Sequence, residues 1–341
     1  MAVIVGIDEA GFGPILGPLV ISSSTFLLPH HLLTSDLWQV LKKSVADRRR
    51  HLAGRVLIAD SKKAFSKSLG IKHLQRTVLA CLKCLGKEPV TLTELLSLVS
   101  ADCLQRLSSY PWYKDAGDQQ ISANKTDVAI AASVLQDDLA SNKLKLLELK
   151  SYCLDVAYYN KMVSAVRNKA SVLFTATCAL INSAFDNFAA PAFSCLPPRL
   201  ASRDAEAGES KSGGLHIIID RQGGRVRYRR VLQRMFPDMQ LKILKETPAA
   251  SSYELLRDGR QMRLHFAVGA DDRFLAVALA SMLSKFLRQL LIENINRYFT
   301  GFHTELKPTA GYWKDGLRFI EDLKQNIPHV AYDSNQLIRC R

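Results

Sequence analysis

Short apolar runs that end in acids or glycines mark the first part of the chain and recur near its middle. Residues 2 to 8 and 18 to 28 are rich in β-branched residues and predict two strands joined by a glycine turn. RVLIAD at 55 to 60 predicts a third strand. LHIIID at 215 to 220 repeats the opening pattern, because it is again an apolar run that closes on an aspartate.

Three further strands are predicted after this run. QLKILKE, SSYELLRDG and QMRLHFAVG each have strand-like composition. The pair Asp258-Gly259 lies between the last two and is a strong signal for a tight hairpin turn.

Helical spacing dominates the middle and the end of the chain. Residues 196 to 214 lie between the helical middle of the chain and the later strands. They are rich in Pro, Ser and Gly and predict a solvated loop. Strands early, helices in the middle and strands again before a helical end predict an α/β fold. Helices are expected in LGIKHLQRTVLACLKCLG, in LTELLSLV, in much of 127 to 148, and over 150 to 190, 271 to 299 and 311 to 326.

The charge balance indicates a polyanionic partner. Lys and Arg outnumber Asp and Glu by 46 to 32 in 341 residues, which gives a net charge of +14. Nucleic acid, a membrane surface and simple solubility all remain compatible with this charge. We expect no apolar run of the sequence to be long enough to cross a membrane, and we expect no membrane partner.

The cysteines indicate a reducing compartment. Seven cysteines, an odd number, are spread over a long chain that opens without a signal-peptide pattern, which favours free thiols and a cytoplasmic location. Cys81 and Cys84 form an isolated C-x-x-C. Two buried thiols are the favoured interpretation, because a structural zinc site needs four ligands.

Acids recur where predicted strands end. Asp8 and Glu9 close the first strand, Asp220 closes another, and Asp271 opens a helix after a third. Ligands commonly bind at the carboxyl ends of strands in α/β folds, and clustered carboxylates suit Mg²⁺ or Mn²⁺. Taken singly, each acid has a simpler explanation as a turn residue or a helix N-cap.

Four motifs in order resemble those of the type 2 ribonuclease H family, ribonuclease HII. GIDEAGFGPILGPLV is similar to its Asp-Glu-Ala-Gly-Arg-Gly-Pro signature, and ADSKK at 59 to 63 to its Asp-Ser-Lys-Lys segment. IIID ending at Asp220 resembles the strand of its third acid. GADDRFLAVALASMLSKFLRQ at 269 to 289 aligns without a gap on the segment from its fourth acid into a helix.

The resemblance implies a ribonuclease H-like fold, with a mixed five-stranded sheet flanked by helices. It implies a catalytic domain over 1–87 and 150–341, with helices at its C-terminal end, and a helical insertion over 88–149. The implied activity is two-metal hydrolysis of the RNA strand of RNA/DNA hybrids, or cutting 5′ to ribonucleotides embedded in duplex DNA. The products carry a 3′-hydroxyl and a 5′-phosphate.

The same resemblance implies the site residues. The metal-binding and catalytic acids fall on Asp8, Glu9, Asp220 and Asp271, with Mg²⁺ or Mn²⁺ as cofactor. A monomer is expected, acting on a hybrid or on ribonucleotide-containing duplex DNA. Residues implied to contact substrate are Gly11, Phe12, Gly13, Lys62, Lys63, Ser281, Lys285 and Tyr312.

Two departures from the family pattern concern the substrate. Phe12 stands where the family has Arg or Lys, and TAGYW keeps Gly311 and Tyr312 but lacks a His-Lys pair. Phe12 either stacks on a base or sugar or packs within its loop. These departures leave open a second class of function, a weakly active or inactive nucleic-acid-binding relative.

Overall fold

The structure, a computed structural model, describes residues 1–65, 70–121, 123–189 and 214–340. The side chains of residues 61, 62 and 115–118 also lie outside this description.

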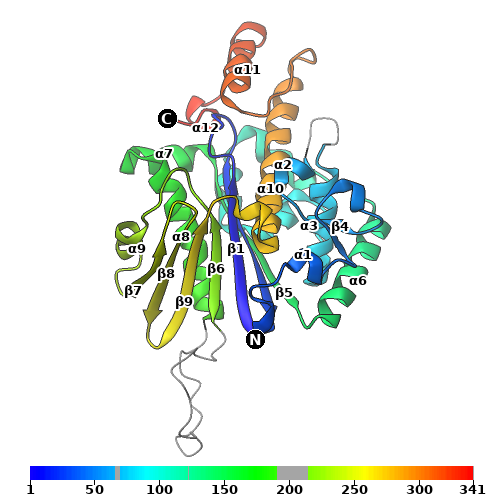
Figure 1. Cartoon of the computed structure of the whole chain (residues 1–341). Coiled ribbons are helices and arrows are strands. Elements are labelled where there is room, and N and C mark those ends of the chain that lie inside the picture. Colours follow the sequence, from blue (N-terminus) through cyan, green and yellow to red (C-terminus); the bar gives the residue numbers. More distant parts are fainter. Residues whose placement is uncertain (66–69, 122, 190–213, 341) are drawn as a thin grey trace, which may run out of the picture.

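One seven-stranded mixed sheet organises the molecule (Figure 1). Its order is β5-β2-β1-β6-β9-β8-β7, in which β1, β6 and β9 run parallel and the other neighbours are antiparallel. The mixed α/β fold with helices on the sheet is therefore confirmed. The strands are β1 (Ala2–Ala10), β2 (Leu19–Leu28), β5 (Lys145–Leu154), β6 (Leu215–Asp220), β7 (Gln240–Glu246), β8 (Ala250–Arg257) and β9 (Arg260–Ala267).

The expected count of five strands is wrong, because β7 and β8 extend the sheet beyond β9. The strand patterns had indicated both. Asp258 and Gly259 join β8 to β9 with φ of 51° and 68°, the left-handed values that a tight hairpin turn requires.

Two local predictions are also wrong. RVLIAD contributes only β4 (Val56–Leu57), which pairs with β3 (Val45–Ala46) in a separate two-stranded sheet. The third strand of the main sheet's meander is β5, which overlaps the ends of two segments, much of 127 to 148 and 150 to 190, in which helices are expected. Lys, Leu and Glu favour helices locally, but pairing along most of β2 decides the conformation.

The helices lie on both faces of the sheet (Figure 1). One hydrophobic core joins α10 to α3, α4 and α6, and the other joins α8 to the strands. The α-helices are α1 (Leu37–Val40), α2 (Ser61–Ala64), α3 (Lys72–Cys84), α4 (Leu92–Val99), α5 (Leu104–Leu107), α6 (Lys125–Ser141), α7 (Val156–Val166), α8 (Lys169–Phe188), α9 (Arg229–Met235), α10 (Leu275–Thr300), α11 (Trp313–Asn326) and α12 (Ser334–Leu337). The 3₁₀ turns are η1 (His30–Leu32), η2 (Arg49–His51), η3 (Ala101–Cys103), η4 (Pro111–Asp118) and η5 (Ala270–Asp272).

Helix α10 passes unusually close to the first strand. A Cβ on Gly6 would lie 2.2 Å from the backbone carbon of Ala276, so only glycine permits this contact. By length and composition α10 could cross a membrane, contrary to the expectation that no segment could. However, 89% of its most apolar window is buried inside the protein, as in the core helix of a folded domain.

Candidate active site

Two of the predicted acids lie on neighbouring parallel strands. Ile7 on β1 pairs with Ile219 on β6, so the next position in the same register sets Asp8 beside Asp220. Asp8 is 7% exposed, and its Oδ1 accepts a hydrogen bond of 2.8 Å from the backbone N–H of Glu9. The carboxyl ends of β1 and β6 therefore present two carboxylates at one edge of the sheet.

The fourth acid is brought in by the turn that follows β9. Asp220 Oδ1 accepts a hydrogen bond of 2.7 Å from the backbone N–H of Ala270, at the start of η5. Asp271 is the next residue. This bond ties the end of β6 to the segment that carries Asp271, so acids from three regions of the sequence meet at one place.

Burial and mutual repulsion affect the ionisation of these acids. Burial raises the pKa of Asp8 well above its usual range, and repulsion from Glu9 and Asp220 raises it further, while a hydrogen bond from Ser281 opposes the shift. Burial, followed by repulsion from Asp220 and Asp271, raises the pKa of Glu9 to about 7. All four predicted acids therefore interact.

The donor set fits a hard divalent cation, since all four side chains are carboxylates. Their arrangement is looser than a formed metal centre. Among the described residues, no group of three or more His, Cys, Asp or Glu side chains converges closely enough to hold an ion. Mutual repulsion favours such a separation of carboxylates.

Two serines on one face of α10 form hydrogen bonds with Asp8. Ser281 is buried and hydrogen-bonds the Asp8 carboxylate. Ser284 Oγ donates to the backbone carbonyl of Asp8 at 3.0 Å and contacts Ser22 Oγ at 2.8 Å. The two serines face the same way because residues three apart share one side of a helix. Ser284 had no sequence signal beyond this spacing.

Replacing Ser284 with Ala should lower the free energy of unfolding by about 1 kcal/mol, because buried hydrogen bonds are lost at the end of β1. Chemical denaturation measures this change. Ser97→Ala is the matched control, since Ser97 is exposed and bonds only within its own helix turn. Equal stability losses in the two variants would contradict the assigned role of Ser284.

The glycine loop, residues 11–17, leaves β1 directly after the acids. Gly11 has φ of 96°, and a Cβ there would lie 2.6 Å from Arg288 Nε, so this position requires glycine. A Cβ added to Gly13 would meet no atom within 4 Å. Phe12 packs partly against the core beside α8, and Lys169 Nζ lies 5.3 Å from the centre of its ring. Phe12 thus has a packing role and also an exposed cation beside it.

Two more predicted substrate residues, one on α10 and one just before α11, contact each other. Lys285 Nζ lies 3.4 Å from the hydroxyl of Tyr312, which is 48% exposed. Trp313 is 40% exposed next to it. An exposed aromatic pair beside a lysine is suited to stacking on bases and pairing with phosphate.

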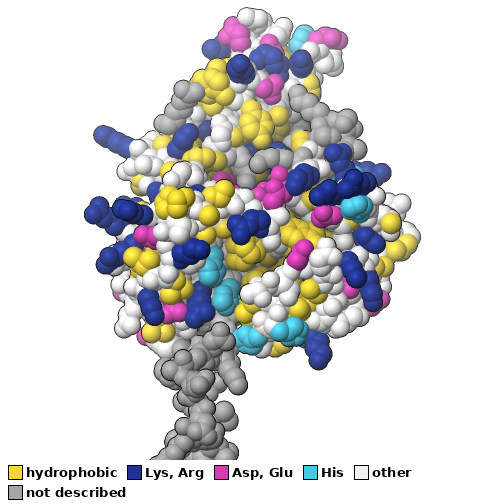
Figure 2. All heavy atoms as spheres, viewed as in Figure 1, with side chains coloured by type: hydrophobic (Ala, Val, Ile, Leu, Met, Phe, Trp, Pro, Cys, Tyr) yellow, Lys and Arg dark blue, Asp and Glu magenta, His cyan; other side chains and the backbone are white. Residues whose placement is uncertain are grey.

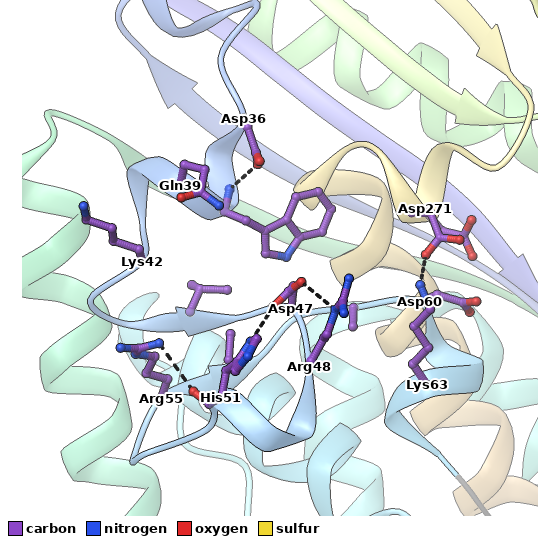
Figure 3. A pocket seen from close by; sticks show the side chains of 15 residues that line it. Asp36, Gln39, Lys42, Asp47, Arg48, His51, Arg55, Asp60, Lys63 and Asp271 are labelled. Carbon is purple, nitrogen blue, oxygen red and sulfur yellow. Dashed lines mark hydrogen bonds and ion pairs between the residues drawn. The ribbon is translucent and has the colours of Figure 1, made fainter.

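A cavity of about 440 Å³ opens beside Asp271 (Figure 3). Lys63 lies at its Asp271 end and forms an ion pair with Asp272, which raises the Lys63 pKa. Lys42 and Arg55 line the far end. The side chain of Lys62, also predicted to contact substrate, lies outside the described part of the structure.

Only part of the basic segment RQGGRVRYRR, which follows Asp220, lies at the protein surface. Tyr228 is fully buried, and its ring stacks on Phe266 with centroids 3.7 Å apart. The guanidinium of Arg225 lies over the rings of Phe174 and Tyr228. The aromatic residue of this segment therefore belongs to the core.

No family model and no curated protein matches the sequence. Solved structures do match it. The ribonuclease HII of Archaeoglobus fulgidus, solved with PCNA, is 15% identical with a TM-score of 0.44, covering 99% of this chain and 94% of that one.

Two further structures are similar at comparable levels. Bst-RNase HIII, solved with Mn²⁺, is 13% identical with a TM-score of 0.39, over 99% of this chain and 66% of that one. Ribonuclease H2 from Pyrococcus horikoshii is 12% identical with a TM-score of 0.41, over 98% and 92%. These solved structures are ribonucleases of types HII and HIII.

Proposed function

We propose that the chain is a metal-dependent endoribonuclease that hydrolyses the RNA strand of RNA/DNA hybrids or cuts 5′ to ribonucleotides embedded in duplex DNA. The observation that carries this proposal is the meeting of Asp8, Glu9, Asp220 and Asp271 at the ends of β1, β6 and β9, where burial and mutual repulsion raise the pKa of Asp8 and Glu9. Such a cluster is unfavourable for folding alone, which points to a functional reason for it.

The proposal gives each part of the site a task. Two Mg²⁺ or Mn²⁺ ions bound by the acids would activate a water and stabilise the leaving 3′-oxygen. Ser281 and Ser284 fix the carboxylate and the backbone of Asp8. Lys63 lines the cavity beside Asp271, and Lys285 contacts Tyr312; these three residues would hold the sugar-phosphate backbone.

The surface charge supports a duplex partner. Figure 2 shows Lys and Arg side chains on both sides of the viewed face, over β7 to β9 and over the helices opposite. Such a distribution favours a polyanion that spans the molecule. We further propose that the protein acts in the cytoplasm as a monomer.

The alternative is a weakly active or inactive relative that binds nucleic acid. It is favoured by the loose spacing of the acids in the described residues and by Phe12 in place of a basic residue. The two proposals differ in whether phosphodiester bonds are cut.

A cleavage assay tests the proposal. Three labelled duplexes are incubated with Mg²⁺ or with Mn²⁺: a full RNA/DNA hybrid, a DNA duplex with one ribonucleotide, and plain DNA. Cutting of either ribose-containing duplex with a 5′-phosphate product supports the endoribonuclease. Binding without cutting by either metal supports the alternative, and equal cutting of plain DNA would show that ribose is not recognised.

Phe12→Arg should bind a hybrid several-fold more tightly, because a phosphate contact becomes available in the glycine loop. The log-log salt dependence of binding should steepen by about one. Fluorescence anisotropy in Ca²⁺ over a range of salt concentrations measures both. Phe302→Arg adds the same charge at an exposed position outside the loop. Identical salt slopes for Phe12→Arg and wild type would contradict the placement of phosphate at this loop.

A further inference from the structure

Two arginines from distant parts of the chain hold the glycine loop from within the protein. Arg339 Nη2 donates to the carbonyl of Gly11 at 2.5 Å and also to the carbonyl of Pro14. Arg288 Nη2 donates to the carbonyl of Leu16 at 3.2 Å. Three carbonyls of the loop therefore point at buried guanidinium groups.

Both guanidinium groups are buried, and no carboxylate among the described residues pairs with either of them. Arg339 is 4% exposed and Arg288 2%, and neither forms an ion pair with any residue in the described ranges. Burial lowers the pKa of Arg339 to about 9, with repulsion from Arg288 adding to the effect, and burial lowers that of Arg288 to about 10. Uncompensated buried charges are a poor device for stability, since apolar residues of similar size often serve as well or better.

The orientation of the loop carbonyls fixes the orientation of its amides. The chain contains no cis peptide bond among its described residues, and in a trans peptide the N–H points opposite to the preceding C=O. Because the Gly11 carbonyl points at Arg339, the Phe12 N–H points away from it. This N–H makes no hydrogen bond with any described residue, so it remains available to a ligand oxygen.

The 333–340 segment that carries Arg339 is itself anchored. Asn160 on α7 donates to the carbonyl of Ile338 at 2.9 Å and accepts from the Cys340 N–H at 2.7 Å. The backbone N–H of Arg339, in this segment, donates to the carbonyl of Ile15, in the glycine loop, at 2.8 Å. The segment is therefore fixed both to α7 and to the glycine loop.

We propose that Arg339, together with Arg288, is a positioning residue that turns the Phe12 N–H outward toward an oxygen of the nucleic-acid substrate. The inference rests on the proposed function for the identity of that substrate. It makes substrate binding depend on the 333–340 segment, which lies more than three hundred residues from the glycine loop along the chain.

Arg339→Met tests the proposal, with Arg260→Met as its matched control. Arg260 also donates to backbone carbonyls, those of Ala189 and Phe185, but at the far end of β9. Hydrogen exchange of peptides spanning residues 9–17 and hybrid affinity in Ca²⁺ are measured with the melting temperature. In Arg339→Met, the loop amides should exchange hydrogen about tenfold faster than in wild type. The variant should also bind the hybrid about tenfold more weakly. Its melting temperature should change little, because relief of a buried charge offsets the lost hydrogen bonds.

Arg339→Lys keeps a donor near the same carbonyls and should recover part of the loop protection and of the affinity. Unchanged loop exchange in Arg339→Met would overturn the inference. So would an affinity loss that Arg260→Met reproduces at equal stability. If wild type binds no duplex, the proposed function fails, while the exchange experiment still decides whether Arg339 holds the loop.

Discussion

Asp8→Asn should abolish cleavage of the ribose-containing duplexes, with kcat lowered on the order of a thousandfold, equivalent to about 4 kcal/mol of transition-state stabilisation. The substitution keeps the size of the side chain and removes its charge. It therefore removes a proposed cation ligand at the point where β1 meets β6. Asp220→Asn should act in the same way, and single-turnover cleavage of the hybrid measures both.

Asp8→Asn should not lower the stability of the folded protein. Because burial and the charges of Glu9 and Asp220 raise the pKa of Asp8, a neutral side chain relieves repulsion at neutral pH. The melting temperature of metal-free Asp8→Asn should equal or exceed that of wild type. Loss of activity without loss of stability separates a chemical role from a structural one.

Asp258→Asn is the matched control. It makes the same chemical change at an exposed hairpin turn whose left-handed backbone suits asparagine. Cleavage by Asp258→Asn should match wild type. If Asp8→Asn also cuts as well as wild type, the proposed active site is wrong.

The sequence predicted the elements that deliver the acids, because local patterns determine them. Strands β1 and β6 are apolar runs closed by Asp8 and Asp220, and α10 follows Asp271 with unbroken helical spacing. Strand patterns in the sequence also indicate β7 and β8, the two strands that extend the sheet to seven. Only the family resemblance suggested a smaller sheet.

Strand β5 could not be predicted in this way. Its composition of Lys, Leu and Glu satisfies a helix as well as a strand, and the choice depends on β2, more than one hundred residues earlier. The supports of the glycine loop are hidden for the same reason. Nothing near Arg339 in the sequence indicates that it reaches Gly11, since the contact exists only after α7 and the 333–340 segment have packed.

The electrostatics of the acids give the second large expected effect, a stability that depends jointly on pH and on divalent cations. Glu9 has its pKa raised from 4.5 to about 7 in the folded protein. The folded state therefore binds more protons than the unfolded state between these values. The stability associated with Glu9 is fully present below about pH 4.5 and is lost as the pH rises through about 7, by up to about 3 kcal/mol.

Histidines with a lowered pKa act in the opposite direction, and His216 and His265 do so most strongly. Burial lowers the pKa of His216 and His265 to about 4, so their contribution grows as the pH rises from about 4 to about 6.5. The Glu9 effect is therefore obtained as the difference between wild type and Glu9→Gln, which share both histidines. In EDTA, wild type should lose stability relative to Glu9→Gln as the pH rises from about 5 to about 8.

Addition of Mg²⁺ or Mn²⁺ should reverse this loss, because a cation that binds the ionised acids of the folded protein would stabilise it by mass action. The rise in melting temperature should be larger at about pH 8 than at about pH 5, where protons compete for Asp8 and Glu9. The double variant Asp8→Asn/Asp220→Asn should not respond at either pH, since neither of its two central side chains can offer a charged oxygen. A cation-dependent rise of equal size in the double variant would place the cation elsewhere, and the absence of any rise in wild type at about pH 8 would show that the four acids do not form a metal site.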